Sequence, residues 1–213
     1  MKPRIALFLH QPKCSVQSGN GIMKALSPKY DFKIFTRHEL EDDFFDDVDM
    51  VCFPGGIGDS DSYDYLLTHH APSIRNFISR GGKYLGICMG AYWAGHHYFG
   101  ILKDIQVVQY IKRRRSEIKR SFPTIAPVFW ENRFYNMYFY DGPTFVAEKK
   151  NFKTVSTYYS GEPMAIMQKR IGLIGCHPES LRSWFRKPYM QQHWHEFEHH
   201  DLLLQFVDDL MER

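Results

Sequence analysis

The sequence lacks any apolar run that approaches the roughly 20 residues needed to cross a bilayer. Its start also lacks the long apolar stretch and the small-residue cleavage site of a signal peptide. We therefore expect a cytoplasmic protein that makes no membrane contact. Internal repeats, low-complexity tracts and linker-like segments are missing too, so we expect residues 1–213 to form a single domain.

Cysteine is scarce, with four residues far apart in a chain of 213. This usage argues against a disulfide-stapled secreted fold and favours a reducing compartment. Net charge is low as well, and a value of +3 does not by itself indicate a nucleic-acid partner. The charge is uneven, however, because residues 112–120 hold six basic side chains and one glutamate. We call these residues the basic segment.

Patterns for metals and nucleotides are missing. Neither phosphate-binding glycine pattern is present, so no nucleotide is implied. His195 and His199 stand one helical turn apart, but no acidic third ligand accompanies them at a fixed spacing. We therefore expect no metal and no cofactor.

The first part of the chain alternates short apolar runs with helical spacing. Strand-length runs occupy 4–9, 32–35, 48–53 and 84–87, and helices are expected at 21–26 and 63–79. We place Pro72 in the first turn of the second helix. The alternation predicts a mostly parallel sheet with right-handed crossovers, flanked by helices in a three-layer α/β fold.

From residue 105 onward the pattern changes to strand-length runs separated by turns. This change predicts that the C-terminal half is more antiparallel, although a last strand and a closing helix follow. The expected strands are 105–111, 125–130, 134–140, 145–148, 154–159, 164–168 and 171–176, and the helix spans about 196–211.

The central stretch of the sequence is Gly86-Ile87-Cys88-Met89-Gly90, at the end of the fourth predicted strand. A reactive side chain on a tight strand-to-helix turn projects above the sheet, and flanking glycines allow the close approach that such a nucleophile elbow requires. A helix N-terminus also favours the nucleophilic thiolate. The alternative is an ordinary core cysteine, since free cysteine is often buried.

Two further stretches supply partners for a nucleophile. Pro54-Gly55-Gly56 follows the third predicted strand, and the amide of Gly55 or Gly56 together with that of Met89 would form an oxyanion hole. His177-Pro178-Glu179 follows the last strand, where His177 would be the general base and Glu179 would orient its ring. Read separately, each could be a plain loop.

These three motifs together resemble the class I glutamine amidotransferases. The run from Gly81 to Tyr92, with Tyr138–Pro143 downstream, is more closely similar to the amidotransferase-like domain at the N-terminus of some biotin protein ligases. The resemblance covers nearly the whole chain, is specific around the elbow and is weakest from 106 to 132. It implies a flavodoxin-like fold and a catalytic triad of Cys88, His177 and Glu179.

The resemblance also implies a reaction, in which the cysteine attacks an amide carbonyl and forms a thioester. Glutamine amidotransferases usually place a glutamine four residues after the cysteine, where this chain has Tyr92. The substrate therefore stays open between glutamine and another small amide or amine-bearing compound. Tyr92 and Tyr140 are expected to contact it, and a synthetase that receives the ammonia is the expected partner.

Two rival functions remain. One is a related cysteine hydrolase of similar fold, such as the intracellular protease and deglycase branch. The other is a regulatory or binding subunit, which would meet a synthetase or a nucleic-acid-modifying system through the basic segment.

Overall fold

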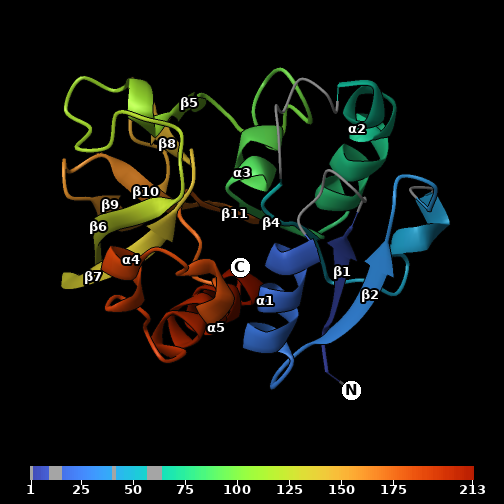
Figure 1. Cartoon of the computed structure of the whole chain (residues 1–213). Coiled ribbons are helices and arrows are strands. Elements are labelled where there is room, and N and C mark those ends of the chain that lie inside the picture. Colours follow the sequence, from blue (N-terminus) through green and yellow to red (C-terminus); the bar gives the residue numbers. More distant parts are fainter. Residues whose placement is uncertain (1, 10–15, 40–41, 57–63) are drawn as a thin grey trace.

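The computed structural model describes residues 2–9, 16–39, 42–56 and 64–213. Its main feature is a nine-stranded sheet in the order β2-β1-β3-β4-β11-β10-β9-β6-β7 (Figure 1). Neighbours from β2 to β11 pair in parallel, and those from β11 to β7 are antiparallel. The predicted contrast between the two halves is thus confirmed.

The strands of the parallel half are β1 (Arg4–Phe8), β2 (Asp31–Phe35), β3 (Met50–Phe53), β4 (Lys83–Ile87) and β11 (Ile171–Ile174). Those of the antiparallel half are β6 (Thr124–Trp130), β7 (Arg133–Phe139), β9 (Lys153–Tyr158) and β10 (Pro163–Gln168). A separate antiparallel pair joins β5 (Gln106–Gln109) to β8 (Pro143–Val146).

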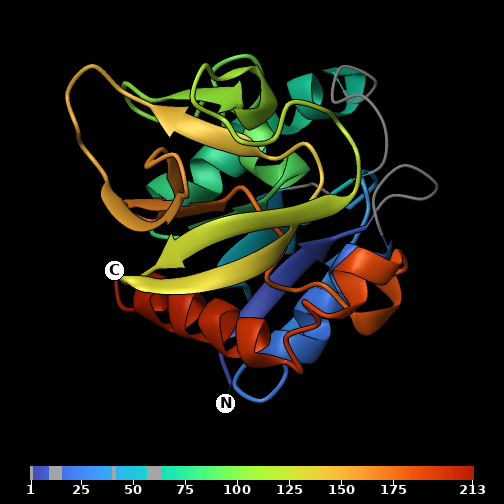
Figure 2. The ribbon, with the colours of Figure 1, turned by 60° about the vertical axis from the view of Figure 1, so that its left-hand side comes forward.

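Helices cover both faces of the sheet, which confirms the predicted three layers. Figure 2 shows α1 (Val16–Leu26) and α5 (Glu198–Met211) below the sheet, with α2 (Asp64–Ser79) and α3 (Met89–Trp93) above it. The remaining helical elements are short: η1 (Asp42–Phe45), η3 (Tyr110–Lys112), η4 (Arg182–Trp184) and α4 (Pro188–Gln191). Within the described ranges, no helix combines the length and apolarity that crossing a membrane requires.

Side-chain alternation along the strands produces two separate cores. In β1, Ile5 and Leu7 pack with α1 and α5, whereas Ala6 and Phe8 belong to the cluster beneath α2 and α3. Successive residues of a strand point to opposite faces, so a strand covered on both sides must be apolar throughout. This requirement explains why β1, β3, β4 and β11 are almost wholly apolar in the sequence, whereas the edge strand β2 contains Asp31 and Lys33.

Several expected elements differ from those observed, and the strand expected at 145–148, for example, is β8 at Pro143–Val146. The first helix begins at Val16 rather than at residue 21, and the strand expected at 105–111 ends at Gln109, where η3 begins. The placement of Pro72 in a first turn was wrong, because it lies inside α2. Buried Ala71, Ile74 and Phe77 anchor α2 on the sheet, and this packing outweighs the local penalty of an interior proline.

Two glycines bring β3, β4 and α3 into backbone contact. A Cβ atom on Gly90 would lie 1.9 Å from the carbonyl oxygen of Phe53, and one on Gly86 would lie 2.4 Å from the carbonyl oxygen of Gly90. Neither distance can be relieved by turning a side chain, because the opposing atoms belong to the backbone. The glycines flanking Cys88 are therefore required by packing between elements.

We expect Gly90→Ala to lower the free energy of unfolding by about 3 kcal/mol, since the added methyl group would push α3 away from β3. Urea denaturation followed by circular dichroism would measure the loss. As a control, Ala91→Gly on the next residue removes a methyl group and should cost about 1 kcal/mol. Equal effects of the two variants would contradict the packing argument.

Candidate functional site

Cys88 lies between β4 and α3 in a strained conformation. Its backbone has φ 50° and ψ −104°, a combination that costs a non-glycine residue about 1–3 kcal/mol. The amide of Cys88 donates to the carbonyl of Ile174 at 2.8 Å, and its thiol lies 3.3 Å from the carbonyl oxygen of Tyr140. This is the geometry of the predicted nucleophile elbow.

The parallel pairing of β4 with β11 brings the histidine to the cysteine. Ile87 pairs with Ile174, so the segments that follow both strands leave the same edge of the sheet. His177 is 5% exposed and Glu179 is fully buried. Nδ1 of His177 lies 2.8 Å from Oε1 of Glu179, so Nδ1 carries a proton that it donates to this carboxylate.

Nε2 of His177 is buried and has no hydrogen bond of normal geometry among the described residues, and its neighbour is the thiol of Cys88. The thiol of Cys88 instead points to the Tyr140 carbonyl, yet it lies close enough to affect the histidine electrostatically. Catalytic hydrogen bonds are often long or poorly aligned in a protein without substrate and shorten in the complex. The arrangement therefore fits an unliganded cysteine–histidine pair.

The charges around His177 favour its protonated form. Burial alone would lower its pKa, but the carboxylate of Glu179 and the neighbouring Cys88 outweigh burial and raise the pKa of His177 to about 10. A cationic imidazole in this position stabilises a thiolate, which is the nucleophilic form of cysteine.

Ser18 is a member of the site that sequence reasoning missed. Its hydroxyl donates to Oε1 of Glu179 at 2.6 Å and accepts the amide of Gly55 at 3.1 Å. The nearby Gly21 allows α1 to approach, since a Cβ there would lie 2.1 Å from the carbonyl oxygen of Glu179. The available signal was the group of small residues Ser18, Gly19 and Gly21, of which the helix expected at 21–26 includes only the last.

The backbone amides of the three predicted oxyanion-hole residues differ in their surroundings. The amide of Gly55 already donates to Ser18, and a Cβ on Gly55 would lie 2.6 Å from Cε1 of His177, so this glycine supports the histidine ring. Met89 is the first residue of α3, where backbone amides have no acceptor within the helix. Gly56 precedes residues outside the described ranges. That Met89 acts with Gly55 or Gly56 stays a prediction, and the bond between the Gly55 amide and Ser18 favours Gly56 as the second donor.

The two predicted substrate contacts, Tyr92 and Tyr140, lie beside Cys88, and Tyr92 is bonded to Asp141, which follows Tyr140 in the chain. The hydroxyl of Tyr92 donates to the carbonyl of Asp141 at 3.0 Å, while the carbonyl of Tyr140 faces the thiol. Asp141 has φ 50°, and burial raises the pKa of its carboxyl group. Because Tyr92 is on α3 and Asp141 follows β7, their bond closes one side of the site.

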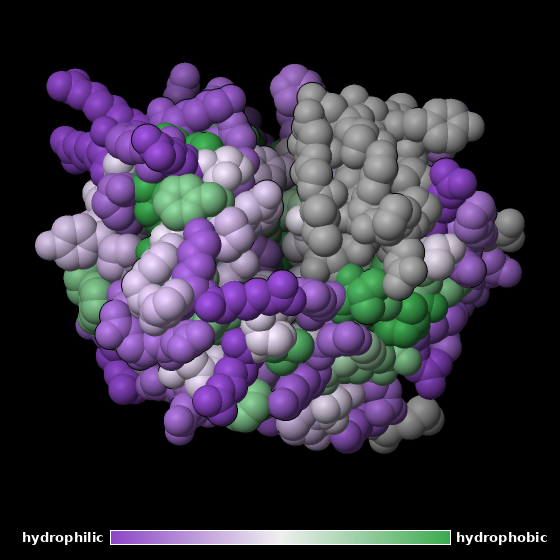
Figure 3. Space-filling view, in the orientation of Figure 1, coloured by the Kyte–Doolittle hydropathy of each residue, from purple (hydrophilic) through white to green (hydrophobic). Residues whose placement is uncertain are grey.

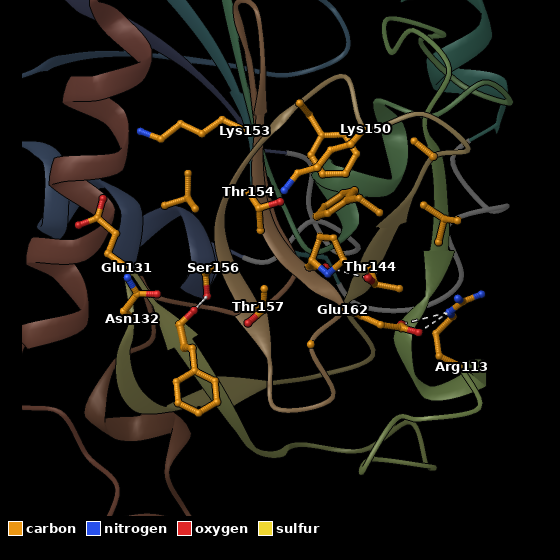
Figure 4. A pocket seen from close by; sticks show the side chains of 18 residues that line it. Arg113, Glu131, Asn132, Thr144, Lys150, Lys153, Thr154, Ser156, Thr157 and Glu162 are labelled. Atoms are coloured by element: carbon orange, nitrogen blue, oxygen red, sulfur yellow. Dashed lines mark hydrogen bonds and ion pairs between the residues drawn. The ribbon is translucent and has the colours of Figure 1, made fainter.

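A pocket of about 620 Å³ lies away from the triad, between β8, β9 and β10 (Figure 4). Its charged residues are of both signs, and Arg113 pairs with Glu162 at 2.9 Å. None of Cys88, His177 and Glu179 lines it, so size alone does not mark it as a reaction site.

Some charged side chains of the basic segment form bonds within the protein. Besides the pair formed by Arg113, Nζ of Lys119 donates to the carbonyls of Arg113 and Arg114 at 2.7 and 3.1 Å. Hydrophilic side chains gather over this corner of the molecule, at the upper left of Figure 3. Two side chains of the basic segment, Arg113 and Lys119, therefore stabilise the conformation of its own loop and neighbouring chain.

No group of three histidine, cysteine or acidic side chains able to hold a metal occurs in the part of the chain that the structure describes. The rings of His195 and His199 stack instead, with centroids 4.0 Å apart and planes 20° from parallel.

Solved structures share this fold over essentially the whole chain. A glutamine amidotransferase from Thermotoga maritima is 13% identical with a TM-score of 0.70, and all of both chains is covered. A structure of PurLQS from the same organism is 15% identical with a TM-score of 0.66, covering 99% of this chain and 100% of that one. The chain thus has the class I glutamine amidotransferase-like fold, as its sequence motifs predicted.

The sequence also matches a family. Residues 11–109 fit the family described as biotin-protein ligase, N terminal, and this stretch contains the glycine turn and the elbow. No curated protein matches the chain. The predicted resemblance to the biotin-ligase N-terminal domain is thus found over residues 11–109, which is less than half of the chain. The likeness to the glutamine amidotransferase structures is one of fold.

We expect Glu179→Gln to lower the pKa of His177 from about 10, because Cys88 alone would then oppose the effect of burial. NMR titration of the His177 ring would measure the change. The raised pKa stabilises the fold below pH 6.5, and this contribution is lost as the pH rises through about 10. A His177 pKa that is unchanged in the variant would contradict the assignment.

Ser18→Ala should reduce the free energy of unfolding by about 1–3 kcal/mol, since it leaves a buried carboxylate oxygen and the Gly55 amide with one partner fewer. Ser79→Ala is the control. Its exposed hydroxyl donates to the carbonyl of Asn76 at 2.8 Å, and its loss should change stability by at most about 0.5 kcal/mol. Thermal or urea unfolding of both variants would compare them.

Proposed function

We propose that the protein is a cysteine-dependent amidotransferase or amidohydrolase that acts through a Cys88–His177–Glu179 triad. The observation that carries this proposal is the strained elbow at Cys88, which lies beside a buried histidine bonded to a buried glutamate. Strain at a single non-glycine residue persists only where the surroundings enforce it, and such positions cluster at active sites.

The proposed reaction has two stages. The Cys88 thiolate attacks the amide carbon, and backbone amides at Met89 and Gly56 stabilise the developing oxyanion. Collapse of the intermediate breaks the carbon–nitrogen bond, the protonated His177 gives its proton to the leaving nitrogen, and a thioester remains. A water molecule that His177 deprotonates then attacks the thioester, which releases the acid and restores the thiol.

The substrate in this proposal is a small amide, with glutamine as the first candidate. The bond between Tyr92 and Asp141 holds a tyrosine where amidotransferases usually have glutamine, so we assign to Tyr92 and Tyr140 the contacts that seat the substrate. We also include a synthetase partner that takes up the released ammonia.

The test is the intact mass of the protein after incubation with a glutamine-mimicking diazoketone. We expect one adduct on Cys88, none on Cys88→Ser, and labelling at least tenfold slower in His177→Gln, which lacks the base. Cys176→Ser is the matched control, because burial raises the pKa of the Cys176 thiol and this thiol should not react. Labelling of Cys88 by iodoacetamide alone would show a reactive thiol that serves an amide other than glutamine.

The second candidate is the regulatory or binding subunit. The observation in its favour is that Lys112, Arg114, Arg115 and Arg120 form no ion pair with any described residue. Such a subunit has no use for an activated thiol, so a Cys88 that resists both reagents would remove the enzymatic proposal and leave this one.

A further inference from the structure

A cluster of three histidines, His195, His199 and His200, lies behind the triad. We call it the histidine cluster. His199 is 2% and His200 is 5% exposed, and the proposed mechanism uses neither. The cluster touches the chain at Ser180, which is fully buried and directly follows Glu179. The segment 177–180 carries both the base and the group that orients it.

Two hydrogen bonds join the histidine cluster to Ser180. Nε2 of His200 lies 3.1 Å from the carbonyl oxygen of Ser180, and Nε2 of His195 lies 3.2 Å from its hydroxyl oxygen. A carbonyl oxygen only accepts, so His200 must carry its proton on Nε2. Ser180 is thus held at its backbone and at its side chain.

The geometry requires a neutral His195. Its Nδ1 accepts the backbone amide of His199 at 3.3 Å, so a proton on Nδ1 would oppose another N–H group. The stacked ring of His199 lies 4.0 Å away, and two cationic rings at this distance would repel. Nδ1 of His199 is buried and has no partner among the described residues, so a proton there would also lack an acceptor.

Few groups around the histidine cluster would stabilise a positive charge on its rings. Glu179 is the acidic neighbour of His200 and is opposed by Lys24 on α1. Tyr135 on β7 packs edge-on against His199, and the other ring neighbours are Phe185, Trp194 and Phe197. Burial, with the neighbouring histidines, lowers the pKa of His195 to about 2, and burial and His200 lower that of His199 to about 3.

We propose that His195 and His200 are positioning residues, which hold segment 177–180 in register with Cys88 through Ser180, and that protonation of the histidine cluster in acid releases this segment. The proposal rests on the triad proposed above, because it concerns the placement of His177 and Glu179. The hydrogen bonds to Ser180 and the neutral stacked pair carry it.

The direction of the acid response follows from the lowered pKa values. A histidine that stays neutral when folded stabilises the fold above its ordinary pKa of 6.5, and this contribution is lost as the pH falls from 6.5 toward about 2. Segment 177–180 should therefore open locally below pH 6.5.

The experiment compares three variants by NMR amide exchange. His200→Leu removes the donor to Ser180, and His200→Gln keeps a donor but cannot titrate. His193→Leu is the control, because it makes the same histidine-to-leucine change at a half-buried histidine outside the cluster. At pH 7.5 the protection factors of the His177 and Ser180 amides should fall roughly tenfold in His200→Leu, the size expected for one lost buried hydrogen bond. They should be unchanged in His200→Gln and His193→Leu.

Two further readings complete the test. Between pH 7 and pH 5 the same protection factors should fall less in His200→Gln than in the unsubstituted protein. Alkylation of Cys88 by iodoacetamide should slow in His200→Leu only. Unchanged protection in His200→Leu, or equal losses in the leucine and glutamine variants, would overturn the proposal. A Cys88 that is never alkylated would instead count against the triad, and the exchange data would still test the role of the cluster.

Discussion

The site depends on the pairing of β11 with β4. β11 comes late in the chain, yet it lies directly beside the strand that ends at Cys88, and the Cys88 amide bonds to the carbonyl of Ile174. Because parallel strands end at the same edge of a sheet, this pairing brings His177 to Cys88. It also joins the parallel half of the sheet to the antiparallel half, since β11 pairs with β10 on its other side.

Burial of Glu179 is the second constraint on the site. A buried carboxylate is unfavourable unless hydrogen bonds compensate for lost hydration, and here His177 and Ser18 donate to the same oxygen. Ser18 reaches the carboxylate because α1 packs closely through Gly21. The first helix and the last strand therefore cooperate in one electrostatic arrangement, and the histidine cluster supports it from the C-terminal side.

Much of the fold and part of the site could be predicted from local patterns. Continuous apolar runs predicted the buried parallel strands, and the glycines around Cys88 predicted a tight turn, because neither property depends on distant residues. Ser18 could not be found in this way, since a serine near a helix start has many roles and its partner lies 161 residues away. Pro72 was misplaced because packing of α2 on the sheet overrides the local preference of proline.

The sequence by itself determined the alternation of strands and helices, the elbow at Cys88 and the presence of a histidine and a glutamate after a strand. These features follow from side-chain periodicity and from the steric freedom of glycine, which act over a few residues. Only the tertiary structure decided that the Gly55 amide donates to Ser18, that Tyr92 bonds to Asp141, and that His195 and His200 bond to Ser180. Hydrogen bonds and burial between distant segments exist only once the chain has closed, so no local pattern encodes them.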